Sequence, residues 1–242
     1  MSISLDVAMS AQLSLMKRLE TIAHNVANVS TVGFRAEESN FSELVSTNTL
    51  DPTAYAQIGD TTLSQRAGAL VKTDGPLDLA VNGNAWFAIQ TPAGQVNTRD
   101  GRLTMLETGD LQTLQGYPIL DVGGAPITLE PSAGPPTIAA DGMITQNGAQ
   151  VGAIGLFRIP DGAKLQRFEN SGVIPSIPAE PVVDFSRNRV VQGFVENSNV
   201  NPVKQMTDLI AVSRLFEGVT NAIQDKERSM QNAIRTLGGS NS

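Results

Sequence analysis

Few residues in this chain could perform acid–base, nucleophilic or metal chemistry. Histidine occurs once, at His24, and cysteine does not occur, which removes disulfides, thiolate metal sites and cysteine nucleophiles. One histidine cannot build a histidine-based metal cluster, and a histidine inside a helix beside Ala23 and Asn25 is poorly placed to activate a serine. The sequence therefore predicts no catalytic residue, no metal site and no cofactor.

Carboxylates are the remaining candidates for catalysis, since Asp and Glu together number 24. Two carboxylates at the right separation could act as the acid and base of a glycoside hydrolase. No spacing in the sequence singles out such a pair. The Asp-Gly pairs, such as Asp100-Gly101, also lack the alternating carboxylates of a calcium loop, and no phosphate-binding loop or nucleophile elbow is present. An enzyme is hence the weakest functional hypothesis.

Charge and hydropathy exclude two classes of partner. The net charge is -7, and the 17 Lys and Arg residues form no cluster, so we expect no nucleic acid partner. No uncharged apolar run approaches the roughly 18–20 residues that a membrane helix requires, so we expect no membrane span. The N-terminus does not resemble a cleavable signal peptide, because Asp6 interrupts its apolar stretch and no positive charge precedes Lys17.

The elements that could position a binding surface are two long helices at the ends of the chain. Helices are expected over 4–29 and 202–237, the second capped by Asn201, because apolar residues recur there every three or four positions. This is the period of a coiled-coil seam, and neither helix can bury its stripe alone. The stripes must therefore meet each other or copies in other subunits. They comprise Leu5, Met9, Gln12, Met16, Leu19, Ala23 and Val26, and Leu209, Val212, Phe216, Val219, Ile223, Lys226, Met230, Ala233 and Leu237.

Two polar residues interrupt these stripes. Gln12 and Lys226 could each fix the register of the helices. Lys226 could equally well extend its ammonium group to the edge of the seam.

The sequence between the helices has a different pattern. Residues 35–73 are rich in Ser, Thr, Asn and Gln and predict an extended connector with a short helix at 40–46. From Asp74 onward, Asp-Gly and Asn-Gly turns recur at short intervals, which is typical of antiparallel strands in a sandwich or a partly open barrel. Strands are expected at 77–81, 85–90, 95–98, 102–106, 111–114, 117–121, 126–129, 151–159 and 189–195.

The expected fold class is α+β. Long N- and C-terminal helices form a coiled-coil-like domain, and a mainly antiparallel β domain lies between them in the sequence. The predicted segments are the N-terminal helix, the connector, the β domain and the C-terminal helix. Their boundaries are 1–34, 35–73, 74–195 and 196–242.

Polar residues gather where the first helix is expected to end. Asn25, Asn28 and Thr31 precede Gly33 and Phe34. Asn and Thr side chains can bond the last backbone groups of a helix, and Gly can make the left-handed turn that ends it. Two Asn residues on one helical face each need a hydrogen-bond partner, so we expect this face to pack against another segment.

The same residues resemble a known signature. The stretch 25–34 is similar to the pattern N-x-x-N-x-x-T-x-G-[FY] near the N-terminus of flagellar rod and hook proteins. Segments 73–87, 98–120 and 196–203 resemble further motifs of that family, in the same order. The resemblance covers both ends and the middle of the chain. The length and the variant Phe216-Glu217 are more similar to the proximal-rod members than to the distal-rod members.

One residue departs from the family pattern. Ala85 stands where the family has Gly, so this position should not need a positive φ.

The resemblance implies a structural subunit of the bacterial flagellar basal-body rod, without enzymatic activity. Such subunits stack into a helical tube, with the terminal helices inside and the β domain outside. The implied partners are proximal and distal rod proteins, further copies of the chain and the flagellar type III export apparatus. The implied location is the rod within the periplasm, reached without a cleavable signal peptide. Both helical stripes, with Asn25, Asn28, Thr31, Gly33 and Phe34, would form the assembly interface.

Three alternatives remain open from the sequence. Within the same family, the chain could be a distal rod or hook-type axial subunit. Outside it, the β domain could be a binding or adaptor module that the helices dimerise, which predicts a discrete dimer. A wall-directed hydrolase is the third, and it requires two carboxylates paired in a pocket.

Overall fold

The computed structural model describes residues 2–46 and 53–238. The chain divides into two compact units. A helical unit takes residues 1–27, 37–62 and 201–242, and a β unit takes residues 28–36 and 63–200. Each unit therefore combines segments that are distant in the sequence.

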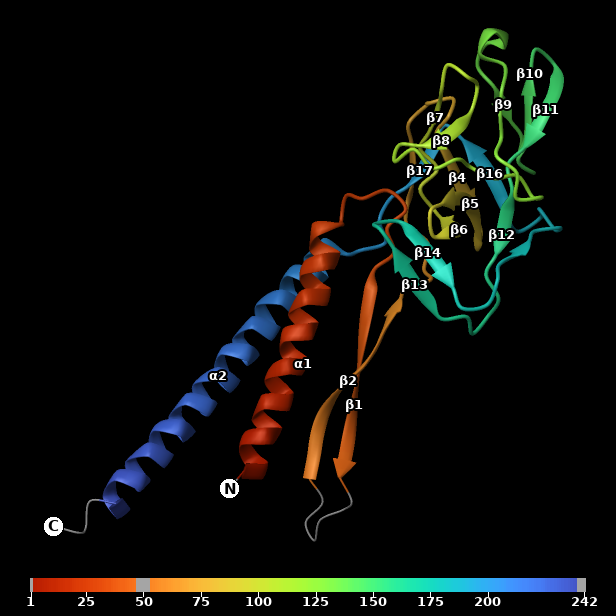
Figure 1. The fold of residues 1–242 in the computed structure, drawn as a ribbon. Coiled ribbons are helices and arrows are strands. Elements are labelled where there is room, and N and C mark those ends of the chain that lie inside the picture. Colours follow the sequence, from red (N-terminus) through yellow and green to blue (C-terminus); the bar gives the residue numbers. More distant parts are fainter. Residues whose placement is uncertain (1, 47–52, 239–242) are drawn as a thin grey trace. The chain divides into compact units, whose positions relative to one another are not determined.

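Two antiparallel helices dominate the helical unit. Helix α1 is Ser2–Ala27 and helix α2 is Pro202–Gly238, close to the ranges expected from the sequence. The helices lie side by side, and Gln12 donates a hydrogen bond to Thr220 over 3.2 Å (Figure 1). The start of α2 is capped as predicted, because Asn201 Oδ1 accepts a hydrogen bond from the Lys204 amide at 3.1 Å.

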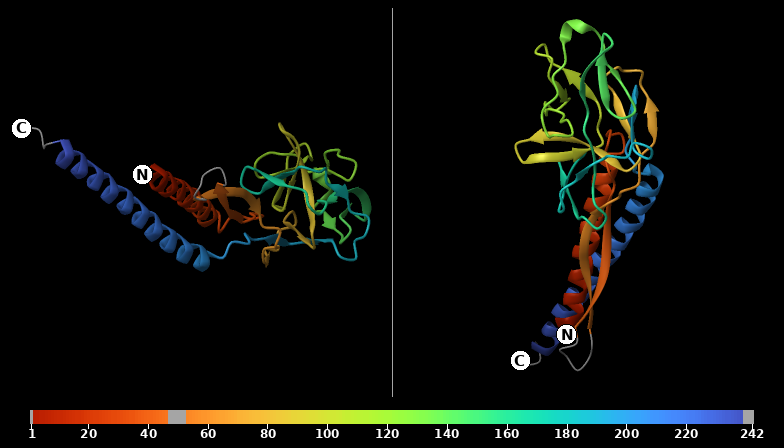
Figure 2. Two further views of the ribbon diagram at one scale, coloured as in Figure 1. Left: turned by 90° about the horizontal axis from the view of Figure 1, so that it is seen from below. Right: turned by 90° about the vertical axis from the view of Figure 1, so that its right-hand side faces the viewer.

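A β-hairpin completes the helical unit. Strands β1, Glu37–Ser46, and β2, Thr53–Leu63, form a two-stranded sheet, and β1 runs beside α1 (Figure 2). The predicted helix at 40–46 is therefore wrong, and the expected connector contains a hairpin. Ser39, Asn40 and Ser42 have low helix propensity, and pairing with β2 satisfies the backbone of β1 instead.

A six-stranded antiparallel sheet is the largest element of the β unit. Its strand order is β13-β14-β6-β5-β12-β15. In that order the strands are Leu165–Phe168, Gly172–Pro175, Gly94–Thr98, Ala85–Thr91, Leu156–Arg158 and Glu180–Pro181.

Smaller sheets surround this one. Strand β4 pairs with β16, β3 with β17, and β7 with β8, while β9, β10 and β11 form a three-stranded sheet. Together with the 3-10 helix Pro131–Ala133, the described part of the chain thus holds a mainly antiparallel β unit without a closed barrel. The strands of these smaller sheets are β3, β4, β7, β8, β9, β10, β11, β16 and β17. In that order their bounds are Leu70–Lys72, Leu79–Asn82, Leu103–Met105, Leu111–Thr113, Thr137–Ile138, Met143–Gln146, Ala149–Ala153, Arg189–Gln192 and Phe194–Glu196.

The main hydrophobic core lies inside the β unit. Phe87 of β5 is fully buried among side chains of several sheets, including Leu79, Leu111, Ile144 and Leu156. The first five residues of β5 are all buried, so this strand reads as a continuous apolar run rather than an alternating one. Ala85 has no positive φ, as expected from its departure from the family pattern.

Most of the expected strands are confirmed, with differences where tertiary pairing decides. Segments 117–121 and 126–129 form isolated bridges rather than full strands. The single strand expected over 151–159 is two strands, since β11 pairs with β10 and β12 with β5. The range 189–195 likewise divides into β16 and β17, which pair with β4 and β3.

Val212 provides a direct test of the helix pair. It is 1% exposed, whereas Val203 on the same helix is 73% exposed. An unpaired carboxylate at position 212 would be buried, so Val212→Asp should destabilise the helical unit by at least about 3 kcal/mol. The measurement is loss of helical signal in far-UV circular dichroism on heating. Val203→Asp is the matched control, and equal melting of both variants would contradict the packing described here.

Candidate assembly surfaces

A buried carboxylate lies at the centre of the β unit. Glu196, at the end of β17, is 1% exposed. One carboxylate oxygen lies 2.8 Å from Arg35 Nη2 and accepts a hydrogen bond from the Gly68 amide at 2.8 Å. The other accepts a hydrogen bond from Arg99 Nη1, also at 2.8 Å. The single carboxylate of Glu196 thus forms ion pairs with two buried guanidinium groups.

The two guanidinium groups are held by further contacts. Arg99 donates to the carbonyl oxygens of Val81 at 3.1 Å and Gly83 at 2.6 Å, and Arg35 donates to the carbonyl oxygen of Arg66. The ring of Trp86 lies 5.3 Å from the Arg35 guanidinium and 5.1 Å from that of Arg99. The aromatic face attracts both cations, which supplements the single carboxylate.

Burial opposes the charge of both arginines. Desolvation lowers the pKa of Arg99 to about 10 and also lowers the pKa of Arg35, while the negative charge of Glu196 opposes the shift in each case. Both groups remain charged near neutral pH. Loss of Glu196 would leave two buried cations close together without a counter-ion.

The end of the N-terminal signature belongs to this network. The Gly33 amide donates to the Glu196 carbonyl oxygen at 2.7 Å, and Gly33 has φ +72°. A Cβ atom there would lie 2.4 Å from the Asp100 amide nitrogen, so only glycine fits. Phe34 is 1% exposed, with the Arg167 guanidinium 4.3 Å from its ring centre.

Asn199 fixes the backbone that follows. Its Oδ1 accepts a hydrogen bond from the Ala36 amide at 2.7 Å, and its Nδ2 donates to the Arg66 carbonyl oxygen at 2.7 Å. Segments that are widely separated in the sequence therefore meet around Glu196. They are the stretches whose motifs carried the family resemblance.

The two asparagines at the end of the first helix both have partners, as predicted. Asn25, in the helical unit, donates from Nδ2 to the Glu37 carbonyl oxygen and accepts from the Glu37 amide, both at 2.8 Å. Its Nδ2 also lies 3.4 Å from Gln205 Oε1. In the β unit, Asn28 Oδ1 accepts a hydrogen bond from the Thr31 hydroxyl at 3.1 Å.

His24 also has a structural contact. Its Nδ1 atom lies 3.1 Å from a carboxylate oxygen of Glu37 at the start of β1. This pair joins α1 to the hairpin.

The helical stripes expected from the sequence lie partly inside the helical unit and partly on its surface. Val212 is buried, and eight others are half-buried. Five are exposed, and the side chains of Leu5 and Leu237 lie outside the described ones. The half-buried residues are Gln12, Leu19, Val26, Leu209, Phe216, Val219 and Ile223, joined by Lys226 at the edge; the exposed ones are Met9, Met16, Ala23, Met230 and Ala233.

Apart from Asn25, the most buried residues of α1 were not predicted. They are Ser14, Thr21, Ile22 and Asn25, of which only Ile22 is apolar. The hydroxyls of Ser14 and Thr21 donate back to the carbonyl oxygens of Ser10 and Lys17, so they need no other partner when buried. Small hydroxyl residues seven positions apart could have indicated these positions, but a search for apolar periodicity passes over them.

Large apolar side chains remain exposed on both helices. On α1, Met9, Leu13 and Met16 are 51%, 54% and 45% exposed. They follow a three-to-four residue spacing and so lie on one face. On α2, the exposed apolar residues are Val203, Met206, Ile210, Leu215, Met230 and Ile234.

The last turns of α2 extend beyond α1. Because Gln12 lies opposite Thr220 in an antiparallel pair, the part of α1 that precedes Gln12 reaches only to about Met230 at 1.5 Å per residue in each helix. Every described side chain from 227 to 236 is exposed. The end of α2, with Met230 and Ile234, therefore has no partner among the described residues of its own unit.

The described part of the chain holds neither a candidate metal cluster nor a candidate membrane span. No group of three or more His, Asp or Glu residues there is arranged to hold a metal ion. Neither described helix combines the length and hydropathy needed to cross a bilayer.

Three family models match successive parts of the chain. They describe a flagella basal body rod protein at residues 5–35, a flagellar hook protein FlgE/F/G D1 domain at 80–146, and the C-terminal part of flagellar basal body rod FlgEFG proteins at 191–236. The matches include both helices and the Glu196 network. They define the class as axial proteins of the flagellum.

Individual relatives agree over nearly the whole length. A flagellar basal-body rod protein FlgF of Mesorhizobium japonicum is 50% identical over 97% of this chain and 98% of its own. A FlgF of Rhizobium meliloti is 47% identical over 99% and 100%, and a FlgG of Bacillus subtilis is 30% identical over 96% and 97%. The chain belongs to the flagellar basal-body rod protein family.

Glu196→Gln tests the role of the buried carboxylate. The amide keeps the shape of the side chain but removes the only negative charge between Arg35 and Arg99, and breaking a buried ion pair costs about 3–5 kcal/mol. We expect the β unit to lose about 3 kcal/mol, or about 6–12 °C in melting temperature. The measurement is thermal denaturation followed by Trp86 fluorescence. The exposed Glu180→Gln is the control, and identical melting of both variants would refute the role.

Proposed function

We propose that this chain is a structural subunit of the proximal part of the flagellar basal-body rod. It polymerises through the apolar surfaces that its two helices leave exposed, and it supports flagellum-dependent motility as part of the drive shaft. The observation that carries the proposal is the free end of α2. Met230 and Ile234 are 44% and 66% exposed on turns that extend beyond α1.

Apolar side chains in the last turns of a long helix need a partner outside the chain. The sequence continues the seam through Met230, Ala233 and Leu237, although the described residues of the unit provide no second helix there. A helix from a neighbouring subunit would extend the seam and remove these side chains from water. Coiled-coil packing would then arise on assembly rather than within one subunit.

The face of α1 formed by Met9, Leu13 and Met16 offers a second surface. Its residues differ from those at the end of α2, so a contact between the two surfaces would be heterologous. Heterologous contacts that do not close into a ring propagate as a helical filament. Two unlike apolar surfaces on one subunit are therefore suited to an axial tube.

The residues of the N-terminal signature divide into two roles. Asn25 fixes β1 to α1, while Asn28, Thr31, Gly33 and Phe34 hold the backbone of the β unit in place. They support the assembly interface by fixing the segments behind it. For the subunit within the rod, we keep the four segments expected from the sequence. Their boundaries are 1–34, 35–73, 74–195 and 196–242.

The proposed neighbours are proximal and distal rod proteins and further copies of this chain. The relatives named FlgF and FlgG support this, since both are basal-body rod proteins by name. We propose delivery by the flagellar type III export apparatus and a final position in the rod within the periplasm. Among axial proteins, the distal rod or hook-type role is second, because the FlgG relative is similar over almost the whole chain.

A dimeric adaptor module is the alternative from another class. It would use the exposed faces of α1 and α2 to form one closed dimer. The proposed rod subunit instead requires two unlike surfaces and open-ended association. A dimer whose mass does not increase with concentration would favour the adaptor.

Complementation of a gene deletion tests the proposal. Cells lacking this gene should have no flagellar filaments by electron microscopy, and the intact chain should restore them. Ile234→Asp should fail to restore them, because a carboxylate would be buried at the contact between subunits. Asn232→Asp adds the same charge on the opposite face of the same turn and should restore filaments. Filaments in the deletion strain, or in the Ile234→Asp strain, would contradict the proposal.

A further inference from the structure

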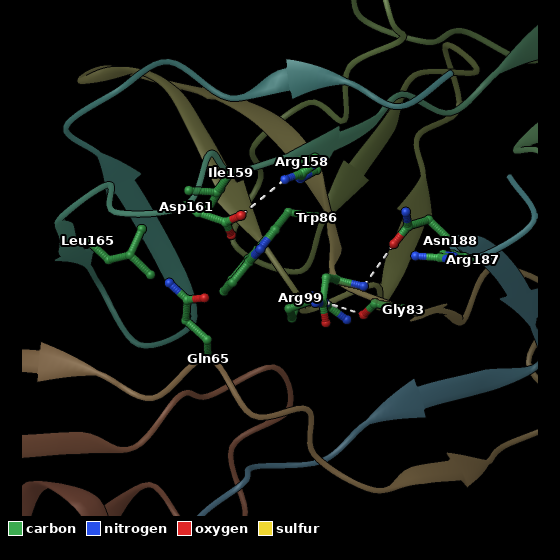
Figure 3. A pocket seen from close by; sticks show the side chains of 11 residues that line it. Gln65, Gly83, Trp86, Arg99, Arg158, Ile159, Asp161, Leu165, Arg187 and Asn188 are labelled. Atoms are coloured by element: carbon green, nitrogen blue, oxygen red, sulfur yellow. Dashed lines mark hydrogen bonds and ion pairs between the residues drawn. The ribbon is translucent and has the colours of Figure 1, made fainter. Parts of the chain in front are cut away.

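A polar pocket lies in the β unit outside the surfaces described above. It encloses about 450 Å³, within the roughly 300–1,000 Å³ of natural ligand pockets. Its wall includes Trp86 and Arg99 together with Arg158, Asp161 and Arg187 (Figure 3). The pocket thus adjoins the Glu196 network, because Arg99 belongs to both.

Positive charge exceeds negative charge in and behind this pocket. Arg99, Arg158 and Arg187 line it, and Arg35 lies behind them against Trp86. The nearby carboxylates are Glu196, which is shared between two arginines, Asp161, and Asp184, whose pKa is lowered by hydrogen bonds from Ser186 and in part by the charge of Arg187. Four guanidinium groups in and behind the pocket thus exceed three carboxylates, in a chain whose net charge is -7. This local reversal of sign would attract an anionic ligand.

Two of the lining arginines are exposed and held only by weak surface interactions. Arg158 and Asp161 are 3.3 Å apart, with side chains 58% and 94% exposed, and such a surface pair adds little stability. Arg187 lines the pocket and is exposed, and its charge acts on the nearby exposed carboxylate of Asp184. Exposed guanidinium groups bind carboxylates through paired N–H donors. Arg99 adds positive charge from below but donates its own hydrogen bonds elsewhere.

A buried nitrogen of Arg99 provides further support for an anionic ligand. Arg99 Nε is buried and has no hydrogen-bond partner among the described residues. Because Arg99 is 2% exposed, its Nε is also shielded from bulk water, so the positive charge of this side chain is incompletely compensated in the free chain. A negative charge in the pocket would offset this deficit at short range.

The pocket does not suit a neutral sugar. Stacking on a sugar requires an open aromatic face, but Trp86 is 4% exposed and its ring lies against the guanidinium groups of Arg35 and Arg99. The neutral hydrogen-bonding residues of the lining are Gln65 and Asn84, which are exposed, and Asn188, whose Oδ1 already accepts a hydrogen bond from the Asn84 amide. The lining favours a ligand that brings carboxylates.

We propose that this pocket binds an acidic peptide segment presented by a neighbouring rod subunit. Carboxylates of that segment would contact Arg158 and Arg187 above Trp86. The proposal rests on the proposed function for the identity of the neighbour, and on charge complementarity for the chemistry. Subunits as acidic as this chain carry the complementary groups. The pocket would then give the β unit a contact that is separate from the apolar helical surfaces.

The sole tryptophan of the chain reports directly on the pocket, because Trp86 lies in its wall. Purified full-length chain is titrated with hexaglutamate while Trp86 fluorescence is recorded. We expect a saturable change that weakens with added salt. The double variant Arg158→Glu/Arg187→Glu should weaken binding at least about tenfold, since the loss of both exposed ion pairs together should cost at least about 1.4 kcal/mol, which is a factor of ten. Lys72→Glu, exposed and outside the pocket, should bind as the parent does.

Three results would overturn the inference. They are no fluorescence response to hexaglutamate, an equal response to hexalysine, and saturation by acetate or inorganic phosphate at the same concentration of charge. The last would identify a general anion site. Both arginines are exposed, so circular dichroism should show that the double variant is folded. An unfolded double variant is replaced by Arg187→Gln, which should likewise weaken the binding of hexaglutamate.

Motility separates this inference from the proposed function. In the deletion strain, Arg158→Glu/Arg187→Glu should reduce swimming relative to Lys72→Glu. Full swimming with the double variant, alongside loss of filaments with Ile234→Asp, would leave the rod proposal intact and refute the pocket as a contact.

Discussion

The carboxylate of Glu196, held between Arg35 and Arg99, is the interaction on which the β unit depends most. It brings together segments from before β3, after β6 and the end of β17, and it receives the backbone amide of Gly68 as well. A buried charge network stabilises little against an apolar replacement, but it strongly penalises any arrangement that leaves one member unpaired. Its geometry therefore selects one position for the backbone around Gly33, where a side chain would collide with Asp100. The same network sets the positive charge beneath the pocket at Trp86.

The helical unit is stabilised by different interactions from those of the β unit. Its helices lie against each other, but α2 contributes mostly half-buried apolar residues, and most of the buried residues of α1 are polar, so the buried surface of the unit is modest in hydrophobicity. Much of the apolar surface remains available, on one face of α1 and at the end of α2. Under the proposed function this division suits a rod subunit, because internal packing would define the subunit and the exposed apolar surface would connect it to its neighbours.

The sequence predicted the long helices because a heptad pattern over many turns is a strong signal, and it predicted the cap at Asn201 from local chemistry. Turn residues likewise located most strands of the β unit. The hairpin of β1 and β2 was missed because its residues have weak local preferences, and pairing decides their structure. The buried residues of α1 other than Asn25 were missed because Ser14 and Thr21 satisfy their own hydroxyls. The Glu196 network could not be predicted, since nothing local relates residues 35, 99 and 196.

Protection of the end of α2 on assembly is the most direct test of this account. The chain has no cysteine, so Ile234→Cys introduces a single thiol at a side chain that is 66% exposed. In the free chain a thiol reagent should label it as fast as Val183→Cys, whose parent side chain is 91% exposed. In isolated basal bodies the thiol at 234 should become resistant to labelling, because a neighbouring subunit covers it. Equal labelling of the thiol at 234 in the free and assembled states would contradict the account.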